Sequence, residues 1–109
     1  MSGQRFSIYA IREIGTIEPR YIGQTSRGPE CRLNRLIWEA RNCSNLGLHF
    51  YKWLRENRNK IEVVEVSAAE TREDAKAQER LLIQSLANMG CRLFNRDHMP
   101  RALKLDRAA

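Results

Sequence analysis

Hydrophobic and polar side chains alternate along residues 5–13, as they do in a β-strand, where neighbouring side chains point to opposite faces. A loop that contains Gly15 and Pro19 leads to a second extended stretch, residues 19–24. Because the connection is short, the two stretches are predicted to form an antiparallel hairpin. Residues 60–67 are rich in β-branched side chains and predict a third strand.

Three other stretches repeat apolar residues at helical spacing. The first begins near Pro29, which suits the first turn of a helix, and the third is capped by Thr71 and stopped by Gly90. The apolar positions are Leu33, Leu36, Ile37 and Ala40 in the first, Leu46, Phe50, Trp53 and Leu54 in the second, and Ala75, Leu82, Ile83 and Leu86 in the third. We expect Trp53, Leu82 and Leu86 to be largely buried.

The order strand, strand, helix, helix, strand, helix predicts an α/β fold of the α+β type. Its sheet is small, three-stranded and mainly antiparallel, and helices flank it. A length of 109 residues fits one domain. We assign residues 1–96 to this domain and residues 97–109 to a basic C-terminal tail.

The charge of the chain points to an anionic partner. The net charge is +6 and the sequence pI is about 9.7, which favours nucleic acid first, although many basic proteins bind none. The cysteine count is odd and shows neither a disulfide framework nor the spacing of a zinc site. The chain has no membrane-length apolar run and no signal-peptide pattern, so we expect a cytoplasmic protein with no membrane partner.

Glu79 lies on the apolar stripe of the third predicted helix, four residues after Ala75 and four before Ile83. A glutamate there loses hydration on folding, which is costly unless a cation or hydrogen-bond donors compensate. It is either a functional carboxylate or an edge residue paired with a surface Lys or Arg. The helix alone favours the second interpretation.

The predicted hairpin places tyrosines where chemistry can gather. Counting by twos puts Tyr9 on the face opposite to Ile8, and puts Tyr21 and Gly23 on the face opposite to Ile22. Gly23 has no side chain, so a neighbouring group or a ligand can approach the backbone there. A site built on both tyrosines requires that they share one face of the sheet.

Five positions together resemble the GIY-YIG nuclease family. The two hairpin motifs are Ser7-Ile8-Tyr9 and Tyr21-Ile22-Gly23, and Gln24-Thr25 continues the second in the usual way. The family also has an arginine on the next helix, which Arg32 matches. Glu79 matches its glutamate on a later helix, and Asn95 matches its asparagine just after that helix. The resemblance spans residues 6–96, and its strength lies in the order of the matches.

This resemblance implies hydrolysis of DNA phosphodiester bonds with one divalent metal ion, Mg²⁺ or Mn²⁺. Glu79 would bind the metal, and a single carboxylate fits Mg²⁺, which keeps several waters. Arg32 would hold the scissile phosphate. Tyr21 would act as general base, which requires that Arg32 and the metal lower its pKa from about 10. Tyr9 would position the water or the phosphate, and Asn95 would hold the site together.

The chain departs from the family pattern at two positions. Ser7 replaces the first glycine of the opening motif, a change between small residues that we expect to be tolerated. Leu36 stands where many members have His or Tyr. It either borders the cleft, where it would mark a missing catalytic group, or packs in the core with Leu33 and Ile37.

We expect DNA contacts from Arg32, Arg35, Arg101 and Lys104, although the last two could equally lie in a solvated tail. Two alternatives to a self-sufficient endonuclease stay open. One is a nucleic-acid-binding module with weakened catalysis, and the other is a nuclease subunit that a partner protein targets. No separate DNA-recognition domain is predicted within these residues.

Overall fold

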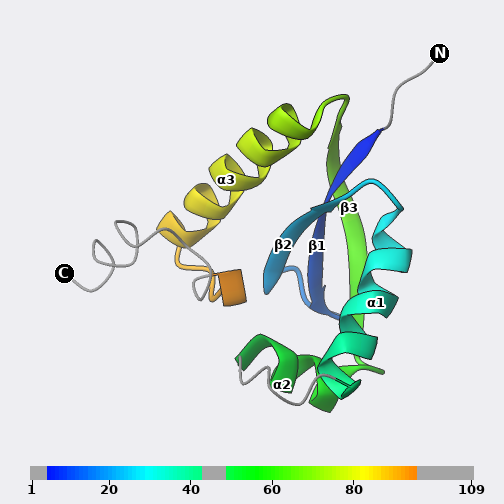
Figure 1. The fold of residues 1–109 in the computed structure, drawn as a ribbon. Coiled ribbons are helices and arrows are strands. Elements are labelled where there is room, and N and C mark those ends of the chain that lie inside the picture. Colours follow the sequence, from blue (N-terminus) through cyan, green and yellow to red (C-terminus); the bar gives the residue numbers. More distant parts are fainter. Residues whose placement is uncertain (1–4, 43–48, 96–109) are drawn as a thin grey trace.

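The structure is a computed structural model that describes residues 5–42 and 49–95. Within these residues, three antiparallel strands form one sheet: β1 (Phe6–Glu13), β2 (Tyr21–Thr25) and β3 (Ile61–Ala69) (Figure 1). The strand order is β2-β1-β3, so β1 is central and β2 is an edge strand. The helices are α1 (Pro29–Asn42), α2 (His49–Asn57) and α3 (Arg72–Asn88). The predicted α+β fold and its element order are confirmed.

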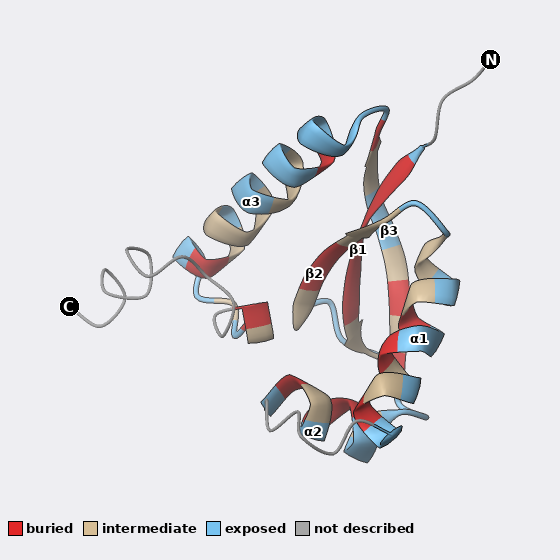
Figure 2. Cartoon of the chain, in the orientation of Figure 1, coloured by how far each residue is buried: buried red, intermediate tan, exposed pale blue. Residues whose placement is uncertain are grey.

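The sheet carries a hydrophobic core on each face, because the central strand β1 is buried on both sides (Figure 2). One core gathers side chains of the sheet, α1 and α2, and its buried members are Tyr9, Ile11, Leu33, Leu36, Ala40, Phe50, Trp53, Leu54, Ile61 and Val63. The other lies under α3, and its buried members are Phe6, Ile8, Ala10, Ile22, Ala69, Ala75 and Leu93. The alternation of β1 thus divides its side chains between the two layers.

The expected burial is confirmed for Trp53 and is less complete for Leu82 and Leu86. Trp53 is 9% exposed, whereas Leu82 and Leu86 are half-buried against the core under α3. Among the described elements, a single helix covers that face, so the flanks of its apolar stripe keep contact with solvent. The predicted Leu46 lies outside the described residues.

Local sequence signals set both ends of α3. The Thr71 hydroxyl accepts a hydrogen bond from the Asp74 backbone N–H at 3.1 Å, which caps the first turn. Gly90 follows the helix with a φ of 91°, a conformation that favours glycine. The chain can therefore turn back toward the sheet, where Leu93 is buried.

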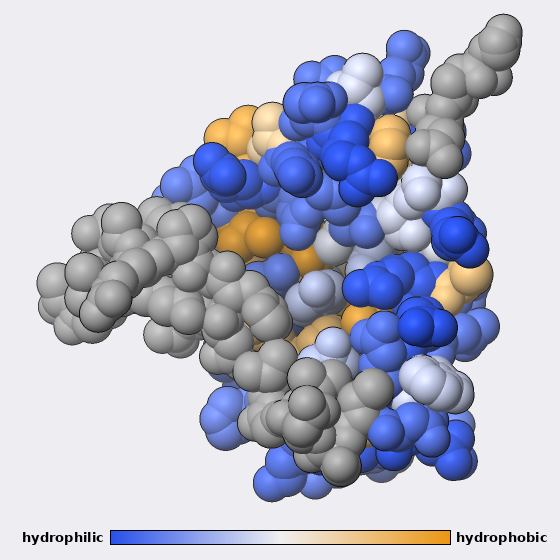
Figure 3. All heavy atoms as spheres, in the orientation of Figure 1, coloured by the Kyte–Doolittle hydropathy of each residue, from blue (hydrophilic) through white to orange (hydrophobic). Residues whose placement is uncertain are grey.

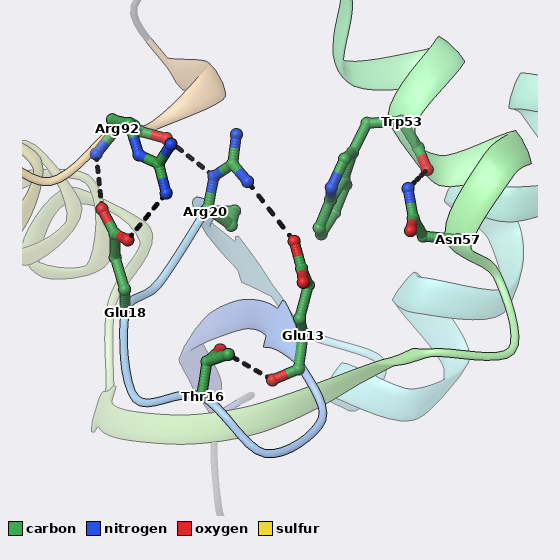
Figure 4. A network of polar contacts seen from close by, with 7 residues as sticks. All are labelled: Glu13, Thr16, Glu18, Arg20, Trp53, Asn57 and Arg92. Carbon is green, nitrogen blue, oxygen red and sulfur yellow. Dashed lines mark hydrogen bonds and ion pairs between the residues drawn. The ribbon is translucent and has the colours of Figure 1, made fainter.

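A polar network ties the β1–β2 connection to the segment after α3 (Figure 4). Arg20 donates from Nε to the Arg92 carbonyl at 2.9 Å and pairs with Glu13 at 3.6 Å. Glu18 accepts from the backbone N–H of Arg92 at 3.0 Å and from its guanidinium at 3.3 Å. The backbone N–H and then the guanidinium of Arg92 lower the pKa of Glu18. These contacts fix the edge strand β2 against the chain that returns from α3.

Hydrophilic side chains cover most of the face seen in Figure 3, and hydrophobic ones show between α3 and the strands. In the described part of the chain, no helix combines the length and the apolar character that crossing a bilayer requires.

Candidate active site

Tyr9 and Gly23 are paired across β1 and β2, and the tyrosine ring lies over the glycine. A Cβ atom built on Gly23 would overlap the Tyr9 hydroxyl and the ring carbon that bears it. Tyr9 is only 1% exposed, so its ring has little room to move aside. The absence of a side chain at position 23 is therefore what lets Tyr9 lie flat along the edge strand.

Tyr21 lies on the same face of the sheet as Tyr9, as the site requires. The two ring centroids are 6.4 Å apart, and both rings belong to the core shared with α1 and α2. The Tyr21 ring also stacks on Phe50 of α2, with centroids 4.1 Å apart and planes 8° from parallel. This stacking holds Tyr21 in place from the helical side.

Arg32 reaches the tyrosines from the first turns of α1. Its backbone N–H bonds to the Gly28 carbonyl at 3.1 Å, which starts the helix directly after the loop from β2. Its side chain hydrogen-bonds to Tyr9. Burial alone would lower the pKa of Arg32, but the bond to Tyr9 and the charges of Tyr9, Glu39 and Tyr21 raise it, so the guanidinium stays charged. The site thus contains a fixed, oriented cation.

Glu79 approaches the site from the opposite layer, on α3. Gln24, whose position on β2 faces α3, donates a hydrogen bond from Nε2 to Glu79 Oε1 at 3.2 Å. Burial raises the pKa of Glu79, while the bond from Gln24 and the charge of Lys76 act against this rise. The Glu79 charge also raises the pKa of both Tyr9 and Tyr21. The carboxylate is therefore close to the tyrosines across the edge of β2.

Asn95 supports the site from behind the edge strand. It is 5% exposed, accepts from the Ile22 N–H at 2.7 Å and donates to the Ile22 carbonyl at 2.8 Å. The neighbouring Phe94 N–H bonds to the Arg20 carbonyl at 2.7 Å. Asn95 thus pairs the backbone groups that an edge strand leaves open, and its place in the fold agrees with the predicted role of holding the site together.

The pKa of Tyr21 moves away from the value that a general base needs. Burial raises the pKa of Tyr21 well above 10, the charges of Tyr9 and Glu79 add to the rise, and only Arg32 lowers it. Burial likewise raises the pKa of Tyr9 against the hydrogen bond and charge of Arg32. The expectation that Arg32 helps to lower the pKa of Tyr21 is correct in sign, but burial outweighs it. Both hydroxyls are protonated at neutral pH in the protein alone.

Leu36 belongs to the core and does not border the site. It is 2% exposed and packs among the buried residues between α1, α2 and the sheet. The interpretation of Leu36 as a packing residue is therefore the correct one of the two. Substitution by His would bury an imidazole among apolar groups.

Two residues at the site, Tyr51 and Gln24, were assigned no functional role from the sequence. The charge of Tyr51, on α2, raises the pKa of both Tyr9 and Tyr21, and its hydroxyl donates to Glu39 at 3.4 Å. The amide oxygen of Gln24 is buried and has no hydrogen-bond partner among the residues that the structure describes. The alternation of β2 could have placed Gln24 toward α3, but no local signal places Tyr51.

Comparison of the chain with protein-family models, with curated proteins and with solved structures gave no match in any of the three. The case for function therefore rests on the motif resemblance and on the geometry of these side chains.

The donor set suits a hard divalent cation bound largely through water. No cluster of three His, Cys, Asp or Glu side chains forms within residues 5–42 and 49–95, and Glu79 is the carboxylate that the motif pattern predicts at this site. Gln24 occupies only one oxygen of that carboxylate. Mg²⁺ and Mn²⁺ accept such oxygen ligands, and Mg²⁺ needs only one or two carboxylates beside water and phosphate. The raised pKa of Glu79 and the unpaired amide oxygen of Gln24 are both features that a nearby cation would relieve.

The residues predicted to contact DNA divide into two sets. Arg32 and Arg35 lie one helical turn apart on α1, and Arg35 is exposed and pairs with Glu39 at 3.1 Å. Arg101 and Lys104, together with the predicted tail 97–109, lie outside the described residues.

Proposed function

We propose that this protein is a metal-dependent endonuclease that hydrolyses phosphodiester bonds of DNA. One observation carries the proposal. Arg32 of α1 and Glu79 of α3, which come from opposite layers, both act electrostatically on the same two hydroxyls, those of Tyr9 on β1 and Tyr21 on β2. The site therefore combines a cation for phosphate, a carboxylate for a metal and hydroxyls for water.

Arg32 is the phosphate-binding group in this proposal. Its hydrogen bond to Tyr9 orients the guanidinium, and Tyr9 is itself fixed between Gly23 and the core. A guanidinium offers two parallel donors to a phosphate and stabilises the charge that builds there during hydrolysis. Because Arg32 is oriented before substrate arrives, little reorganisation is needed.

Glu79 is the metal-binding group, and Gln24 keeps its carboxylate directed at the β2 edge. Mg²⁺ or Mn²⁺ bound there would add positive charge next to the scissile phosphate. Tyr21 is the proposed general base, because its hydroxyl shares the site with Arg32 and Glu79. Its raised pKa predicts slow cleavage at neutral pH.

A second candidate is a DNA-binding module with weakened cleavage. The observation that favours it is the raised pKa of Tyr21, which leaves very little ionised hydroxyl at neutral pH. Either candidate also accommodates a partner protein that selects the DNA target. Cys31 and Cys91 are free thiols, which suits a reducing compartment, and we place the activity in the cytoplasm.

The deciding experiment is the nicking of supercoiled plasmid by the full chain, with Mg²⁺, with Mn²⁺ and with EDTA. The endonuclease proposal expects nicking only with a metal, and expects loss in Glu79→Gln and Arg32→Ala. Arg58→Ala is the matched control, because Arg58 is exposed in the turn between α2 and β3. DNA binding without metal-dependent nicking would favour the second candidate.

A further inference from the structure

A cleft of about 450 Å³ opens beside the candidate active site, between the end of β2 and the first turns of α1. Its lining residues are Thr25, Arg27, Cys31, Arg32 and Arg35. Sites for small ligands typically measure about 300–1,000 Å³, so the cleft has room for more than a single phosphate group. Arg32, whose side chain hydrogen-bonds to Tyr9, also lines the cleft, so the cleft adjoins the candidate active site.

The lining is strongly cationic. Three of its five side chains are arginines and none is a carboxylate. Arg35 is partly compensated by Glu39 at 3.1 Å and lies 5.2 Å over the Trp38 ring, whereas Arg27 is exposed and makes no ion pair among the described residues. Like charges that converge in this way repel one another until an anion enters.

The loop that presents Arg27 is fixed by local contacts. The Thr25 hydroxyl accepts a hydrogen bond from the Arg27 backbone N–H at 3.1 Å. Gly28 follows with a φ of 95° and starts α1 by accepting from Arg32 N–H. The short path from Thr25 to Arg32 therefore holds Arg27 and Arg32 on the same cleft.

We propose that this cleft binds a second phosphate of the DNA strand, next to the phosphate that Arg32 holds, through the guanidinium groups of Arg27 and Arg35. The proposal rests on the proposed function for the identity of the first phosphate. Guanidinium groups bind phosphate oxygens in pairs of parallel hydrogen bonds, and a chain of phosphates is the anion that matches arginines placed in sequence along one cleft. The remaining volume accommodates the sugar that joins the two phosphates.

The test is DNA binding by the full chain in EDTA, so that cleavage plays no part. Fluorescence anisotropy of a labelled short duplex is measured over a range of NaCl concentrations for the wild type and for Arg27→Gln/Arg35→Gln. Arg58→Gln is the matched control, because Arg58 is exposed and does not line the cleft. Each neutralised phosphate contributes about 0.9 to the slope of log K against log[salt]. The double variant loses the second phosphate, so it should lose about 0.9 in slope and bind about tenfold more weakly at 0.1 M NaCl.

Cys31 gives an independent measurement, because it is a free, exposed thiol on the same lining. Its alkylation by iodoacetamide, followed by mass spectrometry of its peptide, should slow several-fold when duplex DNA is present. Cys91 lies after α3 and serves as the internal control, with no change expected.

Equal salt slopes for the double variant and Arg58→Gln would overturn the inference, as would unprotected Cys31 in a saturated complex. If the wild type nicks plasmid while the slopes are equal, only the second phosphate site is wrong. If the slope falls as expected but no metal-dependent nicking occurs, the endonuclease proposal is wrong and the cleft still binds DNA phosphate. A wild type that does not bind DNA would refute both.

Discussion

The contact between Tyr9 and Gly23 allows a sharp test of the site geometry that does not depend on activity. The perturbation is Gly23→Ala. A φ in the left-handed region is observed at Gly15, Gly28 and Gly90 but not at Gly23, so the backbone there can accept alanine. Any cost must then come from the overlap of the new Cβ atom with the Tyr9 hydroxyl and ring.

The expected size follows from two opposing effects. Replacing glycine by alanine inside a strand normally stabilises by about 0.5–1 kcal/mol, because the unfolded chain loses freedom. Forcing extra atoms into a packed core typically costs about 1–3 kcal/mol, and Tyr9, at 1% exposure, has no open space to enter. We therefore expect Gly23→Ala to destabilise the wild type and to become neutral or stabilising in a Tyr9→Leu background, where the ring is absent.

The assay is urea denaturation of the wild type, both single variants and the double variant, followed by circular dichroism. The four free energies of unfolding form a double-mutant cycle, in which the stabilisation that alanine gives a strand is the same in both backgrounds and cancels. The expected coupling is therefore the packing penalty alone, about 1–3 kcal/mol. Penalties that add to within about 0.5 kcal/mol would refute the close contact of Tyr9 with Gly23. They would also remove the structural reason for glycine in the second motif.

Three further predictions concern Glu79, Tyr21 and Leu36. Glu79→Gln should reduce metal-dependent nicking by about 10² or more. Because burial raises the pKa of Glu79, folding disfavours its charged form, and the variant should melt at a higher temperature than the wild type at pH 7 in EDTA. This difference should fade as the pH falls toward 4 and Glu79 becomes protonated. Because burial raises the pKa of Tyr21, the nicking rate should rise by about tenfold per pH unit from pH 6 to 9. Tyr21→Phe should lose nearly all of this activity. A plateau of the rate near pH 7 would show that another group is the base. Leu36→His should lower the free energy of unfolding, measured by urea denaturation, by about 1–3 kcal/mol, and should not raise the rate of plasmid nicking. A variant that is as stable as the wild type and nicks faster would contradict the core position of Leu36.

The sequence predicts most of the fold because its signals are local. Alternation along residues 5–13 gives β1 and its two faces, and Thr71 and Gly90 mark the limits of α3. Leu82 and Leu86 are less completely buried than Trp53, since periodicity identifies the apolar face of a helix but not how completely a sheet covers it. Burial depends on the width of the opposing layer, which is a property of the tertiary fold.

The candidate site is predicted only in part. The residues Tyr9, Tyr21, Arg32 and Glu79 come from the motif pattern, and the two tyrosines share a face of the sheet, as a site built on both requires. The pKa shifts do not follow from sequence, because they depend on burial by α1 and α2 and on a carboxylate that approaches from the other layer. The influence of Tyr51 has the same origin, since it reaches the site from a helix that is distant in sequence.

The edge position of β2 explains why groups from both layers can meet. In the middle of a sheet, the strands themselves separate a side chain on one face from a side chain on the other. At β2, Gly23 has no side chain, and Gln24 turns toward Glu79 on the α3 side while Tyr21 turns toward Arg32 on the α1 side. An exposed edge strand is normally a liability, and here Asn95 pairs the Ile22 backbone groups that would otherwise stay open. The same arrangement therefore stabilises the edge strand and lets side chains from both layers approach one another around it.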